Sequence, residues 1–209
     1  MANSSLAFGF QSFGRRDGGA PTMGLSRYFI NSSDTNLYFT GDPVALSSAQ
    51  YGVLSPYGGP TVLPRVCGVF AGCEYYSPAV GRVVWDKYFP GGVSSSSPVT
   101  AYVIDDPEMT FKVRCSSGAL MGASMVGGNA TVLTSGSSLG NTATGLSAVV
   151  LASSVGLVAG SSYPFTIIDS YSNYAPPGAD GTDNANVYQI MIVGFNNTFR
   201  HAPITGVTT

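Results

Sequence analysis

Two adjacent carboxylates, Asp105 and Asp106, are the residues whose chemistry comes nearest to catalytic machinery. A pair of Asp or Glu side chains is the core of glycoside hydrolysis, in which one acts as acid and the other as base or nucleophile. Neighbouring residues of an extended strand point to opposite faces, so such a pair does not share one substrate. Pro107 follows directly, and Asp-Asp-Pro is typical of a turn. We therefore predict a turn here and no catalytic pair.

The single histidine, His201, could serve a nucleophilic triad only with a suitable partner. The chain has no G-x-S-x-G elbow, phosphate-binding loop, dinucleotide-binding glycine fingerprint or H-E-x-x-H zinc motif. A structural or surface role is favoured for His201. We predict that the protein is not an enzyme, has no catalytic residues and binds no cofactor.

Hard oxygen ligands gather at residues 180–184, where Asp180 and Asp183 lie close to Asn184. Such a run resembles a cation-binding loop, but it lacks the bidentate Glu of an EF-hand and is not repeated. An ordinary loop is favoured and no metal site is predicted, although the sequence alone leaves binding of a cation by Asp180 and Asp183 open.

The cysteines Cys67, Cys73 and Cys115 are odd in number and show no C-x-x-C spacing or nearby histidine. This argues against both a zinc site and a disulfide framework. We predict that all three are small buried hydrophobic residues.

The elements that must position these residues centre on residues 99–115, VTAYVIDDPEMTFKVRC. From Met109 to Cys115 apolar and polar residues alternate strictly, which predicts a strand with one buried face and one solvent-exposed face. Residues 99–104 form a second β-rich run before the Asp-Asp-Pro turn. We expect a central hairpin, or two strands joined by a corner, onto which the rest of the chain packs.

Short β-compatible runs separated by Gly, Pro and Asn turn signals recur along most of the chain, about every ten residues. This spacing predicts an all-β fold, a single antiparallel β-barrel or sandwich domain. We expect an extended arm at residues 1–27, a β domain with long Gly- and Ser-rich loops at residues 28–195, and an extended tail at residues 196–209.

Charged residues make up only 10% of the chain, and the net charge is −2. A surface this poor in charge suits a protein that works inside an assembly, because charge normally keeps a free monomer soluble; a secreted β protein is the alternative. The acidic balance predicts no nucleic-acid binding. Residues 146–159 are too short and too polar to span a bilayer, so no membrane association is expected.

Isolated aromatic and basic residues mark both ends of the chain. On a Gly-rich backbone they cannot build a core of their own, but aromatic and Arg side chains make strong interface anchors. We predict that they contact a partner protein, and the predicted contact residues are Phe8, Phe10, Phe13, Arg15, Arg16, Phe199 and Arg200. The alternatives for the arm are a frayed tail or a segment folded back on its own domain.

Residues 39–44 read FTGDPV, residues 68–75 read GVFAGCEY, and residues 101–107 read AYVIDDP, followed by TFKV at 110–113. Together they resemble motifs of the head decoration or cement proteins of tailed bacteriophages. The resemblance implies a β-rich protein on the exterior of the virion, made in the host cytoplasm. It also implies binding to the major capsid protein, usually as a homo-oligomer such as a dimer or trimer.

The predicted function is therefore a structural virion protein that clamps neighbouring major capsid proteins and stabilises the head. A tail- or vertex-associated host-recognition β domain is the alternative, with residues 116–145 and 171–186 as its binding loops. A secreted hydrolase would have to use Asp105 and Asp106, and it is disfavoured for the reasons given above.

Overall fold

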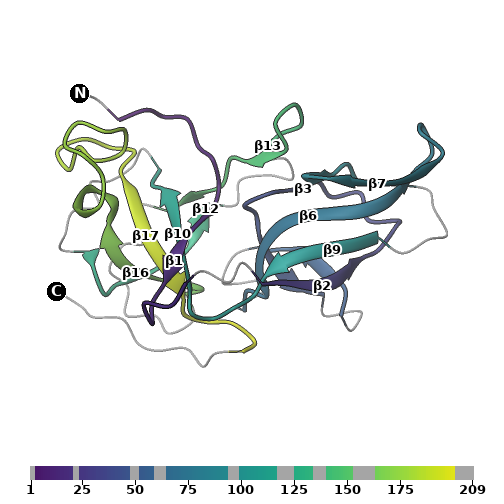
Figure 1. The fold of residues 1–209 in the computed structure, drawn as a ribbon, viewed down its shortest axis with the longest axis horizontal. Coiled ribbons are helices and arrows are strands. Elements are labelled where there is room, and N and C mark those ends of the chain that lie inside the picture. The colour runs from purple at the N-terminus through teal and green to yellow at the C-terminus, as the bar shows by residue number, and fades with distance from the viewer. Residues whose placement is uncertain are drawn as a thin grey trace.

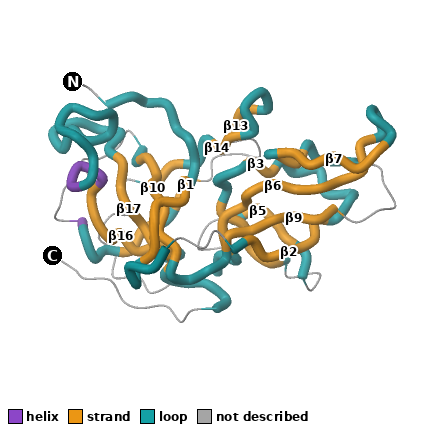
Figure 2. The backbone as a smooth tube through the Cα atoms, viewed as in Figure 1, coloured by secondary structure: helices purple, strands orange, loops and turns teal. Residues whose placement is uncertain are grey.

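The computed structural model describes residues 3–20, 24–47, 52–58, 65–93, 99–116, 125–133, 140–152 and 163–200. These residues confirm the all-β prediction: they form antiparallel sheets in a sandwich-like arrangement, and no sheet of this part closes into a barrel. Two groups of strands lie side by side along the long axis of the molecule (Figure 2). No helix within the described residues has the length and apolar character needed to cross a membrane.

The first group is a five-stranded sheet with the order β1-β10-β17-β16-β11. Aromatic rings fill its core, and Phe165 stacks on Phe10 with ring centroids 4.5 Å apart. The short pair β12–β15 adds Val132 and Leu151 to the same core. The strands are β1 (Gln11–Arg15), β10 (Met109–Arg114), β11 (Asn129–Ala130), β12 (Val132–Leu133), β15 (Val150–Leu151), β16 (Phe165–Ser170) and β17 (Ile190–Phe195).

The second group is a six-stranded sheet with the order β2-β9-β6-β4-β5, in which β7 also pairs with β6 (Figure 1). A short ribbon, β3–β8, contributes Tyr38 and Phe89 to the core on one face. The strands are β2 (Leu25–Ile30), β3 (Tyr38–Phe39), β4 (Pro43–Leu46), β5 (Leu54–Pro56), β6 (Gly68–Ser77), β7 (Arg82–Asp86), β8 (Tyr88–Phe89) and β9 (Val99–Ile104).

Residues 99–115 connect the two sheets, because β9 belongs to the six-stranded sheet and β10 to the five-stranded one. Of the two arrangements expected from the sequence, strand–corner–strand is the one observed. Met109, Phe111 and Val113 are fully buried, as their alternation predicts. The opposite side of β10 was expected to face solvent, and this is wrong for Thr110 and Arg114, which are only 5% and 2% exposed. The N-terminal segment and the loop before β17 cover Arg114.

The predicted N-terminal arm is not an extended arm in the described residues. Residues 11–15 form β1, which pairs antiparallel with β10, and Phe10 is 3% exposed in the core. The predicted arm boundary at residue 27 falls inside β2. The arm therefore folds back on its own domain, because pairing with β10 and burial of Phe10 satisfy both its backbone and its aromatic side chain.

The predicted tail begins with residues that belong to the fold. Asn196, Asn197 and Thr198 are buried, and Thr198 forms an isolated parallel bridge with Val66. Residues 201–209, including His201, lie outside the described residues.

A small hairpin, β13 (Gly140–Asn141) and β14 (Leu146–Ser147), joins the two groups of strands. Thr40, just after β3, donates its N–H to the Gly145 carbonyl and accepts one from the Ser147 N–H, both at 3.0 Å. The backbone of Gly140 lies against the ring of the buried Phe39, so a Cβ at position 140 would overlap the ring carbons. The junction therefore requires a residue without a side chain at position 140.

Gly140→Ala is expected to lower the free energy of unfolding by about 1–3 kcal/mol, because the added methyl overpacks the junction. Gly14→Ala is the matched control, since its Cβ would meet Thr110 Oγ1 at an ordinary 3.6 Å. Urea unfolding of both variants measures the difference. Equal stability of the two variants would contradict the packing of β13 on Phe39.

Candidate functional site

Three of the four aromatic residues predicted to contact a partner contact their own domain. Phe10 packs against Phe111 and Phe165 in the core. Phe13 meets Tyr174 edge-to-face, with ring centroids 5.1 Å apart. Phe8 lies beside the cationic side chains of β10. These rings stabilise the attachment of the N-terminal segment, and Phe10 is not available to a partner.

The basic contact residues are also engaged within the chain. Arg15 forms ion pairs with Asp17 and Asp106, and Arg16 Nη2 donates to the Phe195 carbonyl at 3.0 Å. Burial lowers the pKa of Arg16 from its ordinary value. Arg200 pairs with the buried Asp105 at 2.8 Å.

Phe199, the last of the seven predicted residues, remains 40% exposed. It therefore still presents apolar surface outside the packing of the domain.

The Asp105 and Asp106 carboxylates take different partners and do not form a pair. Asp105 accepts hydrogen bonds from Ser26 Oγ and Tyr28 OH, both at 2.8 Å, in addition to its ion pair with Arg200. Asp106 instead pairs with Arg15 and accepts the Glu108 N–H, which closes the turn before β10. The geometry is that of a tethered corner between the sheets, as the turn chemistry predicts.

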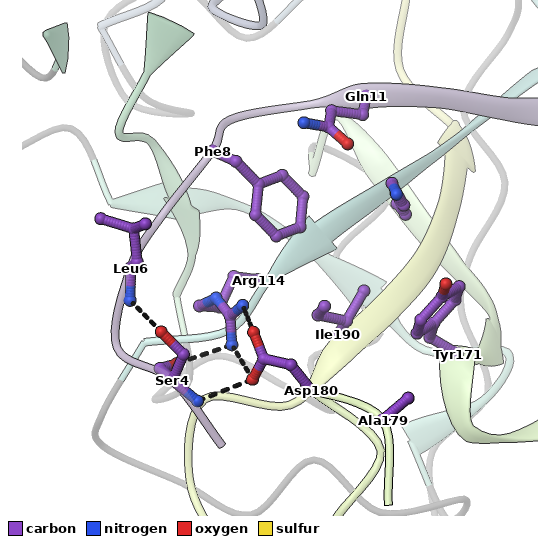
Figure 3. Close-up of a pocket in the computed structure, with 10 residues that line it drawn as sticks. Ser4, Leu6, Phe8, Gln11, Arg114, Tyr171, Ala179, Asp180 and Ile190 are labelled. Carbon is purple, nitrogen blue, oxygen red and sulfur yellow. Dashed lines mark hydrogen bonds and ion pairs between the residues drawn. The ribbon is translucent and has the colours of Figure 1, made fainter. Parts of the chain in front are cut away.

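A shallow pocket of about 370 Å³ lies between the N-terminal segment, β10 and the loop before β17 (Figure 3). Phe8, Tyr171 and Ile190 form apolar walls, and Lys112 and Arg114 supply positive charge. The Lys112 ammonium lies 5.9 Å from the Phe8 ring centroid and 5.7 Å from that of Tyr171, within the range of cation–π attraction. The pocket brings together no nucleophile, base and orienting residue of the kind needed for covalent catalysis.

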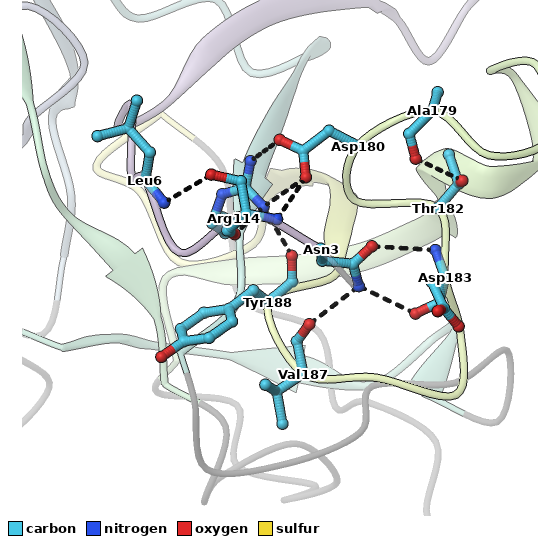
Figure 4. Close-up of polar contacts among 10 residues, drawn as sticks. Asn3, Leu6, Arg114, Ala179, Asp180, Thr182, Asp183, Val187 and Tyr188 are labelled. Carbon is cyan, nitrogen blue, oxygen red and sulfur yellow. Dashed lines mark hydrogen bonds and ion pairs between the residues drawn. The ribbon is translucent and has the colours of Figure 1, made fainter. Parts of the chain in front are cut away.

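Arg114 is the centre of the polar contacts beneath this pocket (Figure 4). Its Nη1 donates to the carbonyls of Ser4 and Tyr188 at 2.6 and 2.9 Å, and its Nη2 pairs with Asp180 Oδ2 at 2.7 Å. The Asn3 amide spans the neighbouring loop by donating to the carbonyls of Asp183 and Val187. One buried guanidinium thus joins β10 to two segments distant in sequence.

The same contacts account for the carboxylates of residues 180–184. The hydrogen bond from Arg114 lowers the pKa of Asp180, and the one from the Asn186 amide lowers the pKa of Asp183. Their oxygens act as acceptors within the loop, and no group of three acidic, His or Cys side chains within the described residues could hold a metal ion.

Asp42 has the raised pKa expected of a general acid or base, but not the access. Burial raises its pKa to about 6, against partial opposition from the Ser147 side chain and the Phe39 N–H. Its Oδ1 is shielded from solvent and has no hydrogen-bond partner within the described part of the chain. The other oxygen, Oδ2, accepts the Phe39 N–H at 2.7 Å, so the carboxylate fixes the turn after β3 and Asp42 is a structural feature of the junction between the sheets.

The three cysteines are free and buried, as predicted. Burial raises the pKa of Cys67 to about 11 and the pKa values of Cys73 and Cys115 to about 12. Their thiols therefore remain protonated at neutral pH.

Exposed apolar side chains gather instead on one face of the six-stranded sheet, which we call the outer face. Directly paired residues of neighbouring strands point to the same side, and the registers place β2, β9, β6 and β7 residues together here. Their opposite neighbours Cys73, Ala101 and Val103 point into the core. The outer face consists of Leu25, Arg27, Phe29, Glu74, Tyr76, Val83, Trp85, Thr100 and Tyr102.

The β6–β7 hairpin, residues 74–86, carries the most exposed part of this face. It extends from the end of the molecule opposite β16 and β17 (Figure 1). Val83 is 64% exposed, Trp85 56% and Val80, at the turn, 55%. A monomeric domain rarely leaves such side chains side by side in water, and Trp and Tyr dominate the energetics of protein interfaces. The hairpin therefore has the character of a contact surface.

The indole of Trp85 lies against Gly72 of the neighbouring strand β6. A Cβ at Gly72 would lie 2.8 Å from Cζ2 of the indole, and Gly72 also adopts a φ of +142°, which side chains rarely tolerate. The glycine thus leaves room for the indole beside the backbone of β6, while the Trp85 side chain stays largely exposed.

Sequence reasoning missed this surface. Within β7, Val83, Val84 and Trp85 are consecutive apolar residues, which places apolar groups on both faces of the strand. In a strand with one packed face, that pattern indicates a second contact surface.

Comparisons with protein-family models, with curated proteins and with solved structures found no match to this chain.

Asp180→Asn is expected to lower the free energy of unfolding near neutral pH by about 1–2 kcal/mol, because the buried Arg114 loses its anionic partner, which is itself half exposed. Because the fold lowers the pKa of Asp180, its contribution is present above the ordinary pKa of an aspartate and is lost as the pH falls through the lowered value. Denaturation over a pH series should therefore show that the free energies of unfolding of the wild type and Asp180→Asn converge in acid. Asp86→Asn, in β7 and remote from Arg114, is the control. A constant difference in the free energy of unfolding between Asp180→Asn and the wild type over the whole pH series would refute the role of the pair.

Asp42→Asn is expected to act in the opposite direction. Because the fold raises the pKa of Asp42 from 3.8 to about 6, ionisation opposes folding above that range. A pKa shift of one unit corresponds to about 1.4 kcal/mol, so Asp42→Asn should raise the free energy of unfolding by about 1–3 kcal/mol near neutral pH. This increase should vanish below about pH 4, where the wild-type carboxyl is also neutral. The same denaturation series measures it, and a gain that is independent of pH would contradict this assignment.

Proposed function

We propose that this chain is a structural virion protein that binds the outside of a tailed-phage head and clamps neighbouring major capsid proteins. The observation that carries the proposal is the projecting β6–β7 hairpin with its exposed Val80, Val83 and Trp85. A hairpin that extends beyond the domain can reach a neighbouring subunit, and apolar side chains on it provide the buried contact that holds two subunits together.

The composition and the sequence motifs support the same role. Only 10% of the residues are charged, which favours contact with other protein surfaces over free solution. The motifs that resemble head decoration proteins lie in β4, β6, β9 and β10, which form and connect the two sheets. In this proposal, the sheets hold the hairpin in a fixed orientation toward the shell.

Clamping does not need a strong individual contact. Many copies bound to one shell act together, so modest interfaces add up to a large resistance against separation of the capsid subunits. The free thiols and the absence of a metal-binding group in the described residues are consistent with a protein that relies on packing.

A host-recognition role is the second candidate, and the exposed indole of Trp85 is the observation that favours it. An aromatic ring lying on a sheet can stack against the apolar face of a sugar. Copy number separates the two proposals: a shell-covering protein is present in numbers comparable to the major capsid protein, whereas a recognition domain at a tail or vertex is present in few copies.

Val83→Asp and Val80→Asp are expected to weaken binding to purified shells lacking this protein by at least about ten-fold, because each places a charge in an apolar contact. Both positions are exposed, so the free energy of unfolding should change by less than about 0.5 kcal/mol. Leu133→Asp, at an exposed position of β12, is the control. Co-sedimentation with the shells measures binding, and unchanged binding of both hairpin variants would refute the proposal.

A further inference from the structure

The outer face carries two opposite charges on either side of one aromatic ring. Arg27 of β2 lies over the Tyr102 ring of β9, with its guanidinium carbon 5.8 Å from the ring centroid. Glu74 of β6 lies on the other side of β9, and burial together with this nearby carboxylate raises the pKa of the Tyr102 hydroxyl. Within the described residues, neither Arg27 nor Glu74 forms an ion pair.

We infer that the outer face seats a second copy of this chain in a two-fold dimer, in which Arg27 of each copy meets Glu74 of the other. The inference rests on the proposed role of this surface in subunit contacts and names one of its partners. Two faces related by a two-fold axis meet through the same residues, so each face must be complementary to itself. A face with one cation and one anion meets this condition.

The strand registers define the geometry. Arg27 is paired with Tyr102, and Glu74 with Thr100, so the two charges lie diagonally across β9. A two-fold axis that crosses β9 obliquely between Thr100 and Tyr102 exchanges the positions of Arg27 and Glu74. The pairing therefore forms twice, once on each side of the axis.

The apolar residues around the charges would be buried by the same contact. Leu25 is 48% exposed and Phe29 50%, and both lie on β2 beside Arg27. Face-to-face packing of two sheets buries such residues from both sides. The same side of this sheet is already covered in part within one chain. There Val69 of β6 and Ile104 of β9 pack into the core cluster of the five-stranded sheet.

Charge complementarity favours a second copy over other occupants. A glycan gains little from an exposed cation and anion that lie on opposite sides of a ring, and a partner of one net charge would repel either Arg27 or Glu74. A second copy satisfies both charges at once.

The test is charge reversal, read out by sedimentation equilibrium of the full chain. The wild type should form a dimer that weakens with added salt, and Arg27→Glu or Glu74→Arg alone should weaken it by at least about ten-fold. The doubly reversed variant, Arg27→Glu with Glu74→Arg, should recover dimerisation, and so should an equimolar mixture of the two single variants. Arg82→Glu, on the inward-facing side of the β6–β7 hairpin, is the control and should leave the dimer unchanged. Circular dichroism establishes that each variant is folded.

Any of three results would overturn the inference. The wild type could be monomeric, both single variants could dimerise as tightly as the wild type, or the doubly reversed variant could fail to recover dimerisation. The shell-binding experiment separates it from the proposed function. A monomer that still binds shells would overturn the dimer alone, whereas a charge-dependent dimer that does not bind shells would support the dimer and overturn the decoration role.

Discussion

The corner at residues 105–108 is the constraint on which the rest of the structure depends, because there the chain leaves one sheet and enters the other. Its two carboxylates are tied in different directions, Asp105 to Ser26, Tyr28 and Arg200, and Asp106 to Arg15. The corner is therefore fixed from both ends of the chain. It determines where β10 begins, and β10 in turn pairs with β1 on one side and β17 on the other.

Local sequence patterns predict what is determined locally. The alternation from Met109 to Cys115 correctly predicts a strand and its buried side, and the Asp-Asp-Pro run predicts the turn before it. Arg114 lies on the predicted side of β10 but is buried there, because the residues that cover it, Ser4 and Tyr188, lie far away in the sequence. The N-terminal arm was mispredicted for the same reason: its partner β10 is about a hundred residues further along, and no local signal reveals that pairing.

The candidate site follows the same division. The Gly-rich ends with isolated aromatic rings suggested interface anchors, but Phe8, Phe10 and Phe13 contact their own domain, and Phe199 alone of the four predicted rings is largely exposed. The outer face depends on the registers of four strands, which bring Phe29, Tyr76 and Trp85 to one side. The one local signal was the consecutive apolar run Val83, Val84 and Trp85. It makes both sides of β7 apolar, although only one side packs against the core.

The burial of all three cysteines has a practical consequence for studying this molecule. Thiolate is the reactive form of cysteine, and thiols whose pKa lies near 11 or 12 inside a packed core react slowly with alkylating reagents at neutral pH. The native cysteines therefore do not compete with an introduced cysteine for a thiol-reactive label. One cysteine introduced at an exposed position of the β6–β7 hairpin would carry a fluorophore or spin label at that position alone, so that distances between copies and to a shell could be measured without first removing the native cysteines.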